Sequence, residues 1–236
     1  FNSSLDWRYV GVLHEYPDCN KKNIKKEVIA DCYILAGLSS NRMDNPKEKY
    51  LKDAITLLEA LQDEPKNKRY HFYLAQSLRD SGFYDYAMEW YKKRADLGGW
   101  EEEVYYSLHN YALCKLKTGK FSFEDDTLNN FLDSFRYRPT RLESLYEIVR
   151  YYTLKKDYEK GFKYAIMGYD SCMNFPSDTL FVNFPIHKYL FLNELAICSL
   201  NNDHFKLALE LYDKIIDISN EIKINLDINI LKKNRE

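Results

Sequence analysis

The sequence predicts an all-α fold built from antiparallel helical hairpins, with a short β-like segment before them. Three observations lead to this prediction. Among 236 residues there are only 8 glycines and 6 prolines, so few residues interrupt a helix. Tyrosine (21 residues) and phenylalanine (13 residues) are abundant, which suits packing between helices. From Asp44 almost to the end of the chain, apolar residues recur at helical spacing.

The composition limits the classes of partner. The chain carries 34 Lys and Arg residues against 36 Asp and Glu residues, a formal net charge of -2. We therefore expect no nucleic-acid partner and no anionic membrane surface, because both attract a basic excess. We also expect no membrane span, since no apolar run approaches the ~20 residues that a spanning helix needs.

The five cysteines are scattered and show no CxxC spacing. This pattern predicts neither a zinc site nor a disulfide framework, and it suits a reducing compartment, so we expect a cytoplasmic protein. The chain starts with Phe1 and not with Met, and we therefore expect residues of a parent protein to precede it.

The first expected element is a short β-like run within DWRYVGVLHEY. It ends at His14–Glu15, a pair that could simply terminate a strand. The first expected helix starts at Pro46, where Asn45 can cap and Glu48 can complete a capping box. Pro65 should stop this helix.

The next segment, RYHFYLAQSLRDSGFYDYAMEWYKKRADLGG, reads as two antiparallel helices with a turn at residues 80–82. Ala75 and Ala87 are small enough to let the two helices approach, and Tyr84 and Tyr91 fill the remaining space. Gly98 and Gly99 then end the second helix. These offsets are those of a tetratricopeptide repeat.

The same offsets recur along the chain. The two small residues of a hairpin are 12 positions apart in Ala75/Ala87, in Val149/Gly161 and in Ala196/Ala208. Another copy begins at Ala112, but Glu124 occupies its small-residue position. Ala54 belongs to a half repeat, and a long capping helix is expected after Asp217. The sequence thus predicts a degenerate tetratricopeptide-like α-solenoid.

Such arrays bind partners on a concave face, whereas the residues that match the repeat belong to the core. Partner-binding candidates therefore come from the stretches between the hairpins: Arg94, Trp100, Arg138 and Arg141. For the three arginines two alternatives remain open. They lie on a solvated face and pair with nearby acids, or they form a patch that binds a phosphate or a glycan acid.

The strings LAQSLRDSG, RADLGGWEEEV and RPTRLESLYE resemble the helical C-terminal region of family 2-like glycosyltransferases, in which a tetratricopeptide-like domain follows a nucleotide-sugar-binding GT-A domain. The resemblance covers residues 69 to 212. DWRYVGVLHEY resembles the end of the GT-A core, with Trp7, Gly11, His14 and Glu15 at the matching positions.

The resemblance implies that residues 1–22 are a remnant of the catalytic domain and that residues 23–236 form the helical domain. It also implies that His14 is a ligand of Mn²⁺ or Mg²⁺ in the intact parent, and that Glu15 is a catalytic residue that orients His14 or lines the acceptor site. No DxD motif precedes His14. We therefore expect this chain alone to hold no metal and to be inactive.

Two hypotheses of function follow. In the first, the chain is the helical part of a glycosyltransferase that moves a sugar from a nucleotide-sugar donor to a glycan or protein acceptor. The helical part then braces the catalytic core and recognises the acceptor or a partner. In the second, the chain is a stand-alone tetratricopeptide-like scaffold that binds a peptide or a partner protein.

Overall fold

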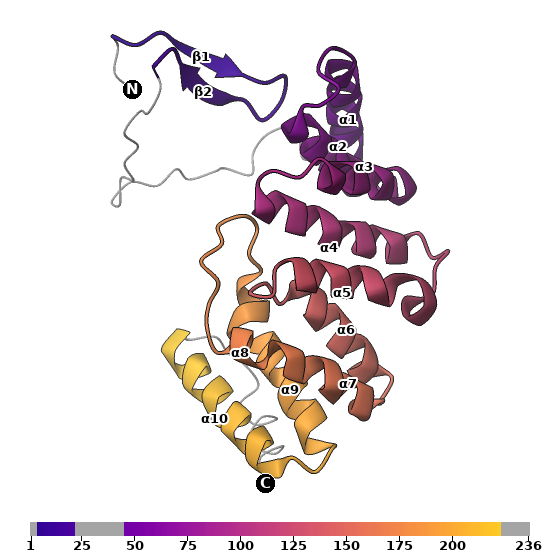
Figure 1. Ribbon diagram of the computed structural model, residues 1–236, viewed down its shortest axis with the longest axis vertical. Coiled ribbons are helices and arrows are strands. Elements are labelled where there is room, and N and C mark those ends of the chain that lie inside the picture. Colours follow the sequence, from indigo (N-terminus) through magenta and orange to yellow (C-terminus); the bar gives the residue numbers. More distant parts are fainter. Residues whose placement is uncertain (1–3, 22–44, 223–236) are drawn as a thin grey trace. The chain divides into compact units, whose positions relative to one another are not determined.

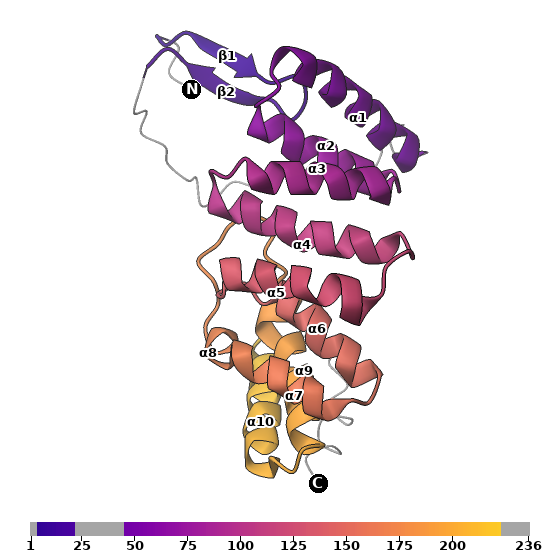
Figure 2. The same ribbon diagram turned by 45° about the vertical axis from the view of Figure 1, so that its right-hand side comes forward.

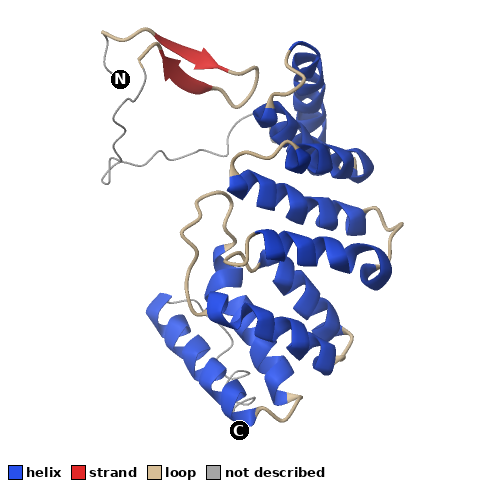
Figure 3. Cartoon of the chain, viewed as in Figure 1, coloured by secondary structure: helices blue, strands red, loops and turns tan. Residues whose placement is uncertain are grey.

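The computed structural model describes residues 4–21 and 45–222, and it divides the chain into two compact units, Phe1–Leu97 and Gly98–Glu236. The fold is all-α, with one short β-hairpin in the described residues (Figure 1, Figure 3). The predicted fold class is therefore confirmed. The predicted domain boundary after residue 22 lies outside the described residues and stays a prediction.

The described residues of the first unit form a β-hairpin and three helices, which are β1 (Trp7–Val10), β2 (Tyr16–Cys19), α1 (Pro46–Asp63), α2 (Lys68–Asp80) and α3 (Tyr84–Asp96). The two strands are antiparallel, and Tyr9 lies opposite Pro17. The first helix starts as predicted, because the Glu48 backbone N–H donates to the Asn45 side chain at 3.3 Å.

The α2/α3 hairpin follows the predicted turn. Gly82 has φ +91°, a left-handed conformation that glycine adopts without a steric penalty. Ala75 and Ala87 are fully buried, as is Tyr91 one helical turn after Ala87. Close approach of the two helices at these small residues is therefore confirmed.

The second unit consists of helices and short helical turns. Its main helices are α4 (Glu101–Lys117), α5 (Leu128–Tyr137), α6 (Glu143–Leu154), α7 (Tyr158–Ala165), α9 (Phe191–Leu200) and α10 (Phe205–Ile222). Shorter turns are η2 (Phe123–Thr127), η3 (Ile166–Gly168), α8 (Tyr169–Cys172) and η4 (Ile186–Leu190). The predicted capping helix begins as part of α10, and its continuation beyond Ile222 lies outside the described residues.

The repeat that begins at Ala112 differs from the simple offset. Glu124 is exposed, and the buried small residue is Thr127, three positions later. Two features together account for this shift. The connection between α4 and η2 (residues 118–122) is longer than that between α2 and α3 (residues 81–83), and η2 is a π-helical turn, which holds more residues per turn than an α-helix. Phe131 then occupies the fully buried position that Tyr91 holds in the α2/α3 hairpin.

No helix in the described ranges combines the length and the apolar character needed to cross a lipid bilayer.

Gly161 on α7 offers a test of the small-residue spacing. A methyl group at this position would lie 2.7 Å from the Cys198 sulfur on α9. We expect Gly161→Ala to lower the free energy of unfolding by about 1–3 kcal/mol, because the extra methyl overpacks the contact. Chemical denaturation followed by circular dichroism measures this loss. In the double variant with Cys198→Ala the loss should be smaller than the sum of the single losses, since the clash is removed.

Candidate protein-binding surface

Arg141 lies at the centre of a buried charge network in the second unit. Its side chain is 1% exposed. It donates two-pronged hydrogen bonds of 2.8–3.1 Å to the carboxylate of Glu143, at the start of α6. A further bond of 3.3 Å reaches Asp178, in the insertion of residues 173–185 that joins α8 to η4. A guanidinium so far from water is stable only when carboxylates compensate it.

Arg138 extends the network toward the surface. Its guanidinium holds Asp178 through two bonds of 2.5 and 2.7 Å, and it reaches Glu101 at the start of α4 at 3.0 Å. Paired bonds between a guanidinium and a carboxylate fix orientation as well as distance. Arg138 therefore links the end of α5, the insertion and the start of α4.

The backbone of the insertion is held by Glu143 and by a further acid, Glu102 on α4. Glu102 accepts bonds from the N–H groups of Thr179 and Leu180 at 2.8 and 2.7 Å. Glu143 accepts one from the Asn183 N–H at 3.0 Å. These carboxylates replace the partners that a helix or sheet would supply to a loop backbone. Figures 1 and 2 show the insertion running beside the α4 end that carries Glu102.

The network keeps its acids ionised. Burial alone would raise the pKa of Glu143, but His187 and Arg141 hold this pKa well below its usual range. Burial likewise acts to raise the pKa of Asp178, and the guanidinium groups of Arg138 and Arg141 lower it below its ordinary value. Both carboxylates are thus charged near neutral pH, and each can form an ion pair with its arginine partners.

Five exposed aromatic side chains lie in the insertion or directly beside network residues in the sequence. We call them the aromatic surface, and each is between 43% and 53% exposed: Trp100, Tyr137, Phe175, Phe181 and Phe184. Trp100 directly precedes Glu101, and Tyr137 directly precedes Arg138. The side chains of Glu101 and Arg138 are bonded to each other. Phe175 and Phe184 lie 5.7 Å apart between ring centres, and Lys188 lies over both rings.

The pairing of Arg138 and Arg141 with acids agrees with one part of the first alternative for these arginines. Both pair with nearby acids, and Arg141 does so in the interior and not on a solvated face. Arg94 is also buried, within α3 of the first unit. Trp100 is exposed and belongs to the aromatic surface. That these four residues bind an acceptor or a partner stays a prediction.

Sequence reasoning missed Asp178 and the three phenylalanines of the insertion. The sequence does contain a signal for these phenylalanines: Phe175, Phe181 and Phe184 stand in a stretch whose apolar residues follow neither helical nor strand periodicity. Large apolar residues in such a segment cannot all be assigned to a core face, which indicates exposure.

His14 lies in the loop between β1 and β2 and packs against α2. Its ring stacks on Tyr73 with 3.8 Å between centres and 10° between planes, and Arg69 donates to its backbone carbonyl. Burial and the nearby Arg69 charge lower the pKa of His14. Glu15 beside it is exposed.

These surroundings do not fit a metal centre within this chain. No group of three or more His, Cys, Asp or Glu side chains in residues 4–21 and 45–222 is placed to hold a metal ion. The cation Arg69 also stands beside His14 and would repel a divalent metal. The roles of His14 and Glu15 in an intact parent stay predictions.

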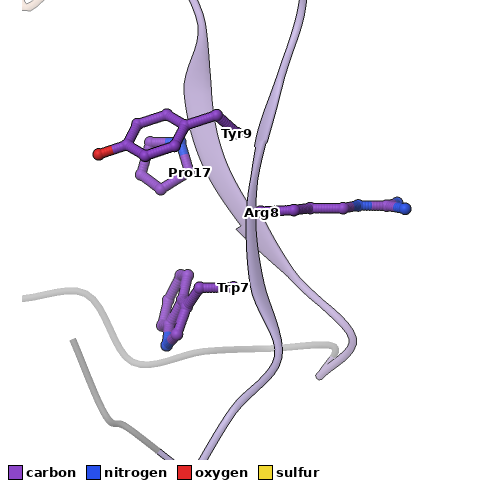
Figure 4. Close-up of a pocket in the computed structure, with 4 residues that line it drawn as sticks. All are labelled: Trp7, Arg8, Tyr9 and Pro17. Carbon is purple, nitrogen blue, oxygen red and sulfur yellow. The ribbon is translucent and has the colours of Figure 1, made fainter.

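The β-hairpin carries a small pocket of about 200 Å³. Figure 4 shows that the side chains of Trp7, Tyr9 and Pro17 lie on one side of the strand and that Arg8 points to the other. The two aromatic rings and the proline of its lining form an apolar contact surface.

Comparison with solved structures finds tetratricopeptide-like folds. A MamA structure (RS-1 ArsTM double mutant) is 15% identical with a TM-score of 0.51, and the match covers 75% of this chain and 88% of that one. Another MamA crystal structure is 11% identical with a TM-score of 0.52, covering 77% and 89%. The fold is a tetratricopeptide-like repeat.

A kinesin light chain from Podospora anserina with TPR-like repeats is 14% identical, with a TM-score of 0.49 and coverage of 75% and 90%. No family model and no curated protein sequence matches the chain. At these identities the likeness to the MamA structures shows the fold alone.

Asp178→Asn tests the network. We expect this change to lower the free energy of unfolding by about 1–3 kcal/mol, because it removes the buried carboxylate that accepts hydrogen bonds from both Arg138 and Arg141. Denaturant titration measures the change. The control is Asp133→Asn, which removes the exposed partner of Arg136 and should change stability by less than about 1 kcal/mol. Equal effects of the two variants would contradict a structural role for the network.

The difference in stability between wild type and Asp178→Asn should depend on pH. The pKa of Asp178 is lowered in the folded state, so its contribution is present above the ordinary value of 3.8 and is lost as pH falls through the folded pKa. We expect a constant difference between pH 5 and pH 8 and a shrinking one below about pH 4. Denaturant titrations at each pH measure it, and a difference that stays constant into acid would argue against the ion pairs.

Proposed function

We propose that this protein is a tetratricopeptide-like scaffold that binds another protein, and that the aromatic surface of the second unit makes the contact. The observation that supports this proposal is the exposure of five large aromatic side chains, three of them in the insertion that the network holds and two directly beside network residues in the sequence. Aromatic residues are enriched at the centres of protein interfaces and dominate binding energy there.

The insertion is well suited to binding because it is already ordered. Phe181 is next to Leu180, whose backbone N–H is bonded to Glu102, and the Phe181 carbonyl accepts a bond from Arg141. The Phe181 ring also lies 5.0 Å from Tyr106 on α4. A surface that is fixed before binding loses little conformational entropy when a partner docks.

The glycosyltransferase hypothesis has no support from the structural neighbours, whose likeness is confined to the helical-repeat fold. It stays a prediction about a parent protein. Assay of nucleotide-sugar turnover on the full-length gene product tests it. Metal-dependent turnover that His14→Ala abolishes would favour this hypothesis, and its absence would leave the scaffold function.

Phe181→Ser tests the scaffold function. A photo-crosslinking amino acid at position 184 of the full chain, introduced in the native host, identifies the partner, and titration calorimetry with the purified partner then measures affinity. We expect Phe181→Ser to weaken binding by about 30-fold, the size of a 2 kcal/mol hot spot. The matched control is Phe205→Ser, because Phe205 is equally exposed on α10 but lies outside the aromatic surface.

Circular dichroism should show both variants folded, since both side chains are exposed. Equal affinities of wild type and Phe181→Ser would contradict this binding surface. A loss in Phe205→Ser alone would move the contact to α10.

A further inference from the structure

Lys188 on η4 lies over two exposed rings of the aromatic surface. Its ammonium nitrogen is 5.4 Å from the centre of the Phe175 ring and 5.7 Å from the centre of the Phe184 ring. These rings are 46% and 43% exposed. A cation at such distances is attracted to aromatic rings, so the positive charge stays beside them at the surface.

The backbone that carries Lys188 is fixed. The Asn183 side chain accepts a bond of 3.3 Å from the Ile186 N–H, and the Asn183 carbonyl accepts one of 3.2 Å from the His187 N–H. Ile186 and His187 are both buried. Lys188 therefore extends from a short turn that two buried side chains hold in place.

The charge of Lys188 is not compensated within the described residues, where it forms no ion pair. Arg138, by contrast, is bonded to Asp178. Arg141 is bonded to Glu143 and Asp178. The cations of the network are thus matched by acids of the chain itself, and the ammonium group of Lys188 is left for an external partner.

A second lysine lies at the start of the insertion. Lys214 on α10 donates a bond of 2.8 Å to the sulfur of Met173, two positions before Phe175. A thioether is a weak acceptor and carries no charge. Lys214 likewise forms no ion pair with a residue that the structure describes. Two uncompensated positive charges therefore lie beside the segment that carries the exposed phenylalanines.

We propose that Lys188 and the rings of Phe175 and Phe184 bind a segment of the partner protein in which an aspartate or glutamate stands beside a large apolar residue. The proposal rests on the scaffold function and names the chemistry of its partner. The partner's carboxylate pairs with Lys188, and its apolar side chain packs on the two rings. A basic segment would meet like charges at this place, so charge complementarity selects the acidic one.

The photo-crosslinking amino acid at position 184 of the full chain also tests this chemistry, since a benzoyl derivative of phenylalanine keeps the ring. We expect Lys188→Glu to lower the yield of crosslinked partner by about ten-fold, because like charges then face each other. Lys188→Arg should keep the yield within about two-fold, because arginine keeps the positive charge. The matched control is Lys163→Glu, which reverses the charge of an exposed lysine on α7 and should leave the yield unchanged.

Mass spectrometry of the crosslinked peptide provides a second measurement. We expect an aspartate or glutamate within a few residues of the point of attachment. Replacing this acid by lysine in the purified partner should restore binding to Lys188→Glu, as a double-mutant cycle by titration calorimetry would show. If circular dichroism shows that Lys188→Glu is unfolded, Lys188→Gln replaces it, with a smaller loss in the same direction.

Unchanged capture by the folded Lys188 variants, or a crosslinked peptide without an acid, would overturn the proposal. If Phe181→Ser still weakens binding in that case, the aromatic surface remains the contact and only the preference for an acidic segment is lost. If neither Lys188 nor Phe181 affects binding, the proposed function of this surface fails as well.

Discussion

The second unit depends on the burial of one positive charge, that of Arg141. A guanidinium withdrawn from water needs carboxylates close by, and here they come from two distant segments, Glu143 at the start of α6 and Asp178 in the insertion. Loss of either acid would leave the buried cation with one carboxylate in place of two. The charge requirement therefore fixes the insertion against α6, although the insertion has no helix or strand of its own between α8 and η4.

The same requirement extends to neighbouring helices. Glu143 also accepts a bond of 3.0 Å from the Tyr105 hydroxyl on α4 and lies 3.2 Å from His187 Nε2 on η4. One carboxylate thus joins α4, α6 and η4. Backbone N–H groups of the insertion donate to carboxylates on α4 and α6. A segment this short cannot also bury three large rings, so its phenylalanine side chains are left on the surface.

Several features of the fold could be predicted from residue spacing. Helices that pack closely need small residues where they touch, and Ala75, Ala87, Gly161 and Ala196 are buried where the spacing placed them. The position of Thr127 could not be predicted in this way. A longer connection and a π-helical turn both change the number of residues between the two helices, so the offset from Ala112 pointed to Glu124.

The sequence by itself determined the helical hairpins, their caps and their turns, because these depend on side chains within a few positions of one another. It also named Arg138, Arg141 and Trp100, but it could not tell a surface arginine from a buried one. Only the tertiary structure decided that, since the partner Asp178 lies 37 positions from Arg141 and 40 from Arg138. Long-range charge pairing leaves no periodic pattern, and so its consequence, an ordered insertion with exposed aromatic rings, appears only in the folded chain.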